Sequence, residues 1–153
     1  MLAEERALRD ELETLAETPR GRELLQLALR GIESDHRELV CGRWERDGEA
    51  GCLFQHAYWQ GVRDGVFHAD DPARDWVSSF IGRGDYWNVI RAIEAFDQLG
   101  QVGHSDRVRR RLLGTRTVLR QAEWREVVTG LLLDALYGGL GDPVRQPDRV
   151  PAG

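Results

Sequence analysis

The sequence contains no lysine, since all 21 of its basic residues are arginine. This absence excludes chemistry that needs a lysine amine, such as Schiff-base formation and phosphate binding by a P-loop lysine. With only two cysteines, the chain also has no network of disulfides. No apolar run approaches the roughly 20 residues needed to cross a bilayer. Three of the first six residues are charged and the segment lacks the apolar stretch of a signal peptide, so we expect a cytoplasmic protein without membrane contact.

Recognisable catalytic motifs are also missing. The sequence has no G-x-S-x-G, no H-E-x-x-H and no glycine-rich phosphate loop. No pairing of a nucleophile with a base can be assembled from it, which favours a binding protein over an enzyme without deciding the question. A net charge of −5 does not favour bulk attraction to nucleic acid.

The 153 residues correspond to about one domain, and apolar residues recur at helical spacing along most of them. We therefore predict an all-α fold, a single compact domain of six or seven helices over residues 1–140. A short hairpin near residues 43–51 is the one β element that the pattern allows. Residues 141–153 contain proline and glycine and are predicted to form a flexible tail.

Two details of this prediction concern helix ends. One helix is expected from about residue 21 to 40, with His36 inside its apolar stripe. Another is expected to end in the glycine-rich segment 99–103, before a short arginine-rich turn. The predicted core consists of Leu25, Leu29, Ile32, Trp76, Phe80, Ile90, Ile93, Phe96, Val128, Leu131 and Leu132.

Two histidines and two cysteines fall within 21 residues: His36, Cys41, Cys52 and His56. Two thiolates and two imidazoles are a ligand set that Zn²⁺ accepts in closed structural sites. Cys52 and His56 are four residues apart at a predicted helix start, so both side chains project from one face. Glu33, one turn before His36, is a candidate for the outer hydrogen-bonding shell. Elemental analysis for zinc and iron tests this prediction.

Other interpretations of the same residues remain open. The spacing is unlike the C-x2-C or C-x4-C knuckles of most structural zinc sites. Cysteine is often buried without any metal, and a histidine on an apolar face is usually a hydrogen-bonded core residue. A Cys41–Cys52 disulfide is a further alternative, which a reducing cytoplasm disfavours.

Aromatic and basic residues beside His56 suggest a second kind of site. An axial His56, aromatic walls from Tyr58 and Trp59, and Arg63 for propionates would suit haem or another flat cofactor. The absence of C-x-x-C-H argues against covalent attachment.

Charge is unevenly distributed. Residues 1–103 hold 12 arginines and 20 acidic residues, whereas residues 104–153 hold 9 arginines and 6 acidic residues. Arg107 with Arg111, and Arg116 with Arg120, are predicted to share helix faces that can contact phosphates. The favoured alternative is that these arginines pair with acidic groups of the same protein or of a partner subunit.

Together these observations favour a small helical regulatory or protein-interaction domain with a structural zinc site. The alternatives are a cofactor-binding protein centred on His56 and a nucleic-acid-binding regulator using the arginine faces. Leu8, Leu12 and Leu15 form an apolar stripe on the first helix that can pack on a second chain, so we expect self-association as a homodimer or a protein partner.

Overall fold

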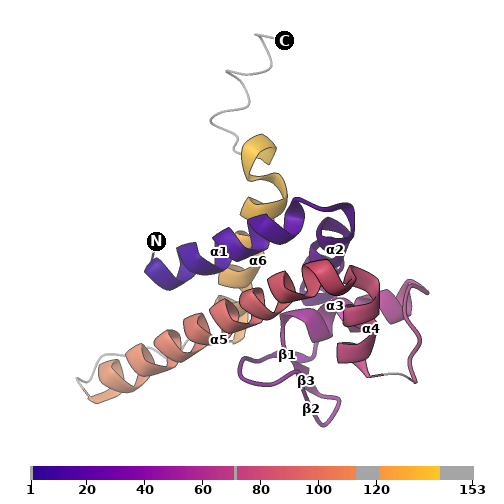
Figure 1. Ribbon diagram of the computed structural model, residues 1–153. Coiled ribbons are helices and arrows are strands. Elements are labelled where there is room, and N and C mark those ends of the chain that lie inside the picture. The colour runs from indigo at the N-terminus through magenta and orange to yellow at the C-terminus, as the bar shows by residue number, and fades with distance from the viewer. Residues whose placement is uncertain (1, 71, 113–120, 142–153) are drawn as a thin grey trace.

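Figure 1 shows the computed structural model, which describes residues 2–70, 72–112 and 121–141, and their side chains except those of 102–112 and 139–141. The described part contains six helices and three two-residue strands. In chain order these are α1 (Ala3–Ala16), α2 (Pro19–Ser34), β1 (Glu38–Leu39), β2 (Glu45–Arg46), β3 (Ala50–Gly51), α3 (Leu53–Arg63), α4 (Ala73–Ile81), α5 (Arg83–Leu112) and α6 (Gln121–Gly141).

Helix α2 is the central element, in contact with α1, α3, α4 and α6. Its N-terminus is well defined, because the Thr18 side chain accepts a hydrogen bond from the Gly21 amide and Pro19 occupies the first turn. Most of its apolar residues are buried, and they do not all lie on one side. A helix that is apolar around most of its circumference is stable only when neighbours cover it.

The most extensive contact between two helices is that of α2 with α3, and it depends on one glycine. A Cβ atom placed on Gly31 would lie 2.3 Å from the carbonyl oxygen of His56 on α3. Only glycine therefore permits the two backbones to approach this closely.

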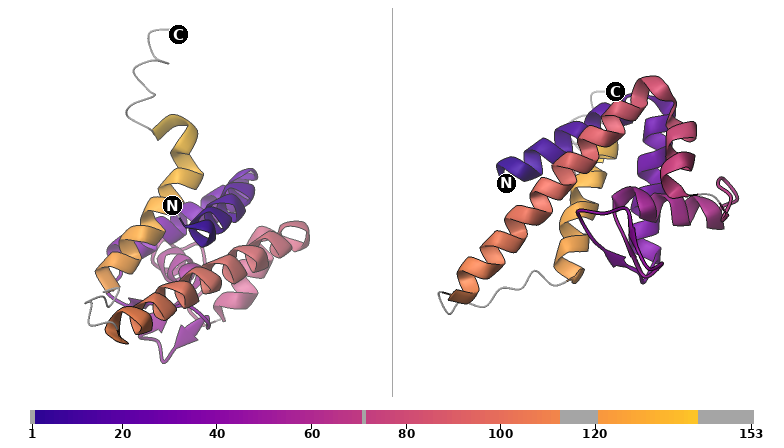
Figure 2. Two further views of the ribbon diagram at one scale, coloured as in Figure 1. Left: turned by 90° about the vertical axis from the view of Figure 1, so that its left-hand side faces the viewer. Right: turned by 60° about the horizontal axis from the view of Figure 1, so that its bottom comes forward.

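Helices α1, α5 and α6 form the other side of the molecule. Helix α1 lies beside α5 and crosses α6, and the C-terminal part of α5 extends beyond the other helices (Figure 2). Leu8, Leu12 and Leu15 are at most 1% exposed in this packing. The apolar stripe predicted to join two chains is thus buried within one chain, and it is not available for a homodimer.

The predicted hairpin is present, but it belongs to a small mixed sheet. β2 and β3 pair antiparallel, with Arg46 opposite Ala50, around a three-residue loop in which Asp47 and Gly48 both have positive φ and the Glu49 amide donates to the Arg46 carbonyl oxygen. β1 then pairs parallel with β3, giving the strand order β1-β3-β2. The all-α prediction is therefore correct for most of the chain and missed this sheet.

The end of α2 also differs from the prediction. The helix stops at Ser34, and Asp35 adopts an extended conformation that leads into β1. The Asp35 carboxylate accepts a hydrogen bond from the Arg37 amide 2.8 Å away, a side-chain turn that competes with further helix. His36 consequently lies outside the helix with its side chain exposed, not on a buried stripe.

The break predicted at residues 99–103 is absent, because α5 continues through this segment to Leu112. Gly100 allows the Cys41 side chain to pack directly on α5, because a Cβ atom at this position would lie 2.3 Å from the Cys41 sulfur. The Gly42 amide also donates to the Asp97 carboxylate at 2.7 Å. The loop after β1 is therefore seated on α5 at the glycine that suggested a helix end. The predicted flexible tail lies, from residue 142 onward, outside the described residues.

Most of the predicted core is buried. Seven of its members are at most 8% exposed, namely Leu25, Leu29, Ile32, Phe96, Val128, Leu131 and Leu132. Trp76, Phe80, Ile90 and Ile93 are half-buried at the border of the core. The helical period thus identified the buried faces, while large side chains at their edges keep some exposure.

Replacing Gly31 by alanine tests the close approach of α2 and α3. We expect Gly31→Ala to lower the free energy of unfolding by about 2–3 kcal/mol, because the new methyl group meets backbone that must move. Gly130→Ala is the control: this glycine is in α6 with no atom within 4 Å of the added Cβ, so the change should stabilise by about 0.5–1 kcal/mol. Urea denaturation measures both, and equal effects would contradict the packing argument.

Candidate functional site

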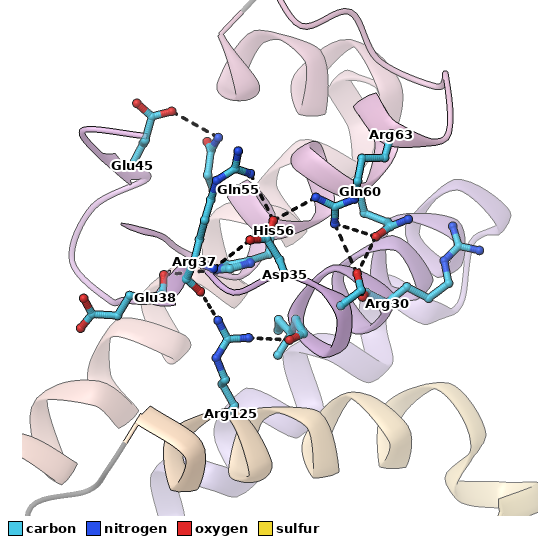
Figure 3. A network of polar contacts seen from close by, with 12 residues as sticks. Arg30, Asp35, Arg37, Glu38, Glu45, Gln55, His56, Gln60, Arg63 and Arg125 are labelled. Carbon is cyan, nitrogen blue, oxygen red and sulfur yellow. Dashed lines mark hydrogen bonds and ion pairs between the residues drawn. The ribbon is translucent and has the colours of Figure 1, made fainter. Parts of the chain in front are cut away.

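The ends of α2 and α3 are joined by a network of polar side chains centred on Asp35 (Figure 3). The Asp35 carboxylate lies 3.1 Å from a guanidinium nitrogen of Arg37 and 3.0 Å from one of Arg63, and its side chain is 6% exposed. Burial by itself would raise the pKa of this carboxyl. The hydrogen bonds from the Arg37 amide and the Arg63 side chain outweigh burial, so the pKa is held below its usual value.

Arg125 connects α6 to the same region. Its guanidinium donates hydrogen bonds to the carbonyl oxygens of Ile32, in the last turn of α2, and of Arg37, in the following loop (Figure 3). Carbonyl groups in a last helical turn have no partner within the helix and attract positive charge. Arg125 supplies both the donors and the charge, and so explains why the chain leaves α2 at this point.

His56 on α3 is completely buried beside this network. Its Nε2 lies 3.2 Å from the Glu38 carbonyl oxygen, and because a carbonyl only accepts, Nε2 carries the proton of a neutral ring. The other nitrogen, Nδ1, is buried and has no hydrogen-bond partner among the described residues. Burial lowers the pKa of His56 to about 4, and the nearby Arg125 and Arg37 charges act in the same direction.

Trp59 covers His56 from outside. Its ring meets the imidazole edge-on with centroids 5.2 Å apart, and the Arg37 guanidinium lies 4.1 Å from the centroid of the Trp59 ring. Arg37 is therefore bound by Asp35 and by an aromatic ring together. These contacts fasten the loop before β1 onto α3.

The four predicted zinc ligands are not gathered at one point. His36 is exposed, Cys41 is half-buried against α5, and Cys52 and His56 are buried at the start of α3. In the residues that the structure describes, no group of three or more histidine, cysteine or acidic side chains is placed to hold a metal ion. Glu33 is exposed on α2. The zinc site therefore remains a prediction from sequence, without support from this placement.

The surroundings of the two thiols make both of them unreactive. Both cysteines are free. Burial raises the pKa of Cys52 to about 12, in spite of its position at the start of α3, and raises the pKa of Cys41 with a further contribution from Asp97. A thiol is a good nucleophile or metal ligand only as the thiolate, which these surroundings disfavour.

The residues predicted to wall a flat cofactor belong to separate clusters. The Tyr58 hydroxyl donates to the His68 carbonyl oxygen, and its ring stacks on Phe67 with centroids 5.7 Å apart. Trp59 instead packs on His56, and Arg63 is tied to Asp35. Haem binding at His56 remains a prediction that these contacts do not favour.

The predicted arginine faces cannot be located in this structure. Arg107, Arg111, Arg116 and Arg120 lie outside the residues whose side chains are described. Arg125, from the same basic segment, donates to backbone carbonyl oxygens of its own chain and not to an acidic side chain, so the expected pairing of the segment with acidic groups stays a prediction.

One surface feature was missed by the sequence analysis. Trp87 on α5 is 69% exposed, the most exposed of the large apolar side chains described. Arg83 and Arg91, four residues to either side, lie on the same face of the helix and are also exposed. We call these three residues the α5 face. The signal was present in the sequence, because Trp87 is out of phase with the buried positions Val89, Ala92 and Phe96.

Neither arginine of the α5 face is paired with a carboxylate among the described residues. This contrasts with Arg30, Arg37 and Arg63, each of which forms an ion pair. The α5 face thus offers an uncovered indole between two unpaired positive charges.

Comparisons of the chain with models of protein families, with curated proteins and with solved structures give no match. Across the described ranges, none of the helices combines the length and apolar character needed to cross a membrane. Function must therefore be argued from the surfaces and contacts above.

The buried His56 predicts a loss of stability in acid. The unfolded chain takes up a proton on this residue near pH 6.5, whereas the folded chain does so only near pH 4. The contribution of neutral His56 to the free energy of unfolding is therefore fully present above pH 6.5. It is lost as the pH falls from 6.5 to 4, by roughly 3 kcal/mol. The low pKa of Asp35 adds a loss of the same sign at lower pH.

We expect His56→Gln, which can still donate to the Glu38 carbonyl, to flatten the decline between pH 6.5 and 4. Urea denaturation at several pH values measures it. His36→Gln removes an exposed imidazole and serves as the control. An unchanged pH profile in His56→Gln would show that another group is responsible.

Removing Arg125 tests its role at the end of α2. Arg125→Met keeps the length of the side chain but leaves the Ile32 and Arg37 carbonyls without this donor, so we expect a loss of about 2–3 kcal/mol. Arg30→Met removes an exposed ion pair with Asp64 and should cost at most about 1 kcal/mol. Chemical denaturation compares the two, and a smaller loss for Arg125→Met would contradict the proposed role.

Proposed function

We propose that this protein is a non-catalytic interaction module that binds another protein through the α5 face. The observation that carries the proposal is the exposure of Trp87 at the centre of a helix face. Tryptophan and arginine are the residue types most enriched among the side chains that dominate binding energy in protein interfaces. The cytoplasmic location expected from the sequence is part of this proposal.

The surroundings of Trp87 support a binding role over a structural one. Within the described residues its indole is in none of the ring contacts that hold the other aromatic side chains, such as Phe96 with Trp124. An exposed tryptophan adds little to the stability of its own fold. Its indole would instead contribute to the free energy of binding, when a partner covers it.

The buried polar groups support a regulatory or structural module over an enzyme. His56, Cys52 and Asp35 are the described groups with the clearest functional chemistry, and each is buried among groups of its own chain. Their ionisation is shifted in the directions that keep the fold intact: neutral imidazole, neutral thiol and charged carboxylate.

A pair of substitutions separates binding from stability. We expect Trp87→Ala to change the free energy of unfolding by less than about 0.5 kcal/mol, because the side chain is exposed. Phe96→Ala, in the core of the same helix, should cost about 3–5 kcal/mol. A large loss of stability in Trp87→Ala would show that the indole supports the fold, and would contradict the proposal.

The binding role itself is tested by photocrosslinking. A benzophenone amino acid is placed at Glu94, an exposed position two helical turns from Trp87 on the same side of α5, or at the exposed position of Leu133 on α6 as control, in cells that make the protein. We expect a discrete adduct with another protein from position 94 only. The captured protein, once purified, should bind Trp87→Ala at least tenfold more weakly than the wild type and Leu133→Ala equally well. Identical adducts from both positions, or equal binding by Trp87→Ala, would contradict the proposal.

A further inference from the structure

The charges around Trp87 identify the chemistry of the partner that its surface fits. Arg83 and Arg91 are separated by eight residues of helix, so their Cα atoms are about 12 Å apart along the axis, with Trp87 midway. Both arginines are exposed and lack a carboxylate partner among the described residues. A surface complementary to these three side chains therefore needs two negative groups about 12 Å apart and an apolar group between them. Glu94, exposed on the same side of α5 and three residues from Arg91, adds one negative charge beyond Arg91.

We infer that the α5 face binds an acidic helical segment of another protein, with two carboxylates eight residues apart and an apolar side chain midway. This inference rests on the proposed function and names its partner class. Each arginine would form a bidentate pair with a carboxylate, with two parallel hydrogen bonds, while the indole would cover the apolar residue. A helix is chosen because it repeats the spacing of α5 when the two helices lie side by side.

A second copy of this chain fits the same surface poorly when the two Trp87 side chains lie opposite each other. When two α5 helices pair in opposite directions centred on Trp87, Arg83 of one faces Arg91 of the other. When they pair in the same direction, each arginine faces its own counterpart. Like charges placed opposite one another in an interface are costly, so both arrangements are disfavoured.

Single-stranded nucleic acid is the other ligand that uses arginine beside an aromatic ring. The net charge of −5 works against a polyanion at long range. A short acidic segment carries less charge than an oligonucleotide, and it meets the same two arginines. The acidic helix is thus the better fit to this protein.

The test uses two labelled, alanine-rich helical peptides and the complete protein. The acidic peptide has glutamates eight residues apart with a leucine midway, and the basic peptide has lysines in place of the glutamates. Fluorescence anisotropy at physiological ionic strength should show at least tenfold tighter binding of the acidic peptide. Trp87→Ala should weaken this binding at least tenfold.

Charge reversal provides the sharpest arm. The double variant Arg83→Glu, Arg91→Glu should bind the acidic peptide at least tenfold more weakly than the wild type does, and should bind the basic peptide more tightly. The matched control Arg6→Glu, Arg43→Glu changes the net charge equally at exposed arginines of α1 and of the loop after β1. Since charges farther apart than about 8 Å are largely screened, it should alter affinity less than threefold.

Several results would overturn the inference. These are equal binding of the two peptides, binding of neither, equal loss in both double variants, or tighter binding of an oligothymidine that the same α5 substitutions abolish. Self-association that Trp87→Ala removes would assign the surface to a second copy. If the crosslinked partner depends on Trp87 but not on the two arginines, the interaction module stands and the acidic partner class is wrong.

Discussion

The close approach of α2 and α3 at Gly31 is the constraint on which the other features depend. Because no side chain separates the two backbones here, the His56 carbonyl lies against α2 and the ends of the helices come together. That places Gln60 and Arg63 of α3 beside Ser34 and Asp35, and turns the His56 ring inward toward β1. A wider spacing would admit water to His56 and remove the burial that lowers its pKa.

The positions of the helices were predictable because the apolar period directly reflects which side of each helix is buried. Their ends were less so, because contacts distant in sequence decide them. The carbonyl of Ile32 at the end of α2 is bound by Arg125, 93 residues away, in addition to the local turn at Asp35, and Gly100 within α5 is the point where Cys41 packs on the helix. A glycine in a helical pattern has two meanings, a helix end or a close approach, and only the neighbouring element distinguishes them.

The candidate site was harder to predict than the fold. Histidine and cysteine drew attention because of their chemistry, yet His56 and Cys52 are buried where burial suppresses that chemistry. The exposed tryptophan carried a plainer signal, since it lies between arginines and out of phase with the buried positions Val89, Ala92 and Phe96. Mismatch between residue type and helix face thus marked an exposed apolar side chain that residue chemistry alone did not.

The small sheet has a consequence for how the protein behaves in a crowded solution. The outer edge of β1 is occupied by the Gln121 side chain, whose amide accepts from the Leu39 N–H and donates to the Leu39 carbonyl, as a neighbouring strand would. The other edge belongs to β2, which consists of two exposed charged residues, Glu45 and Arg46. Unpaired strand edges are where chains recruit one another into larger sheets, and covering or charging them prevents it. Gln121 at one edge and the charged residues of β2 at the other thus both disfavour edge-to-edge pairing with another chain.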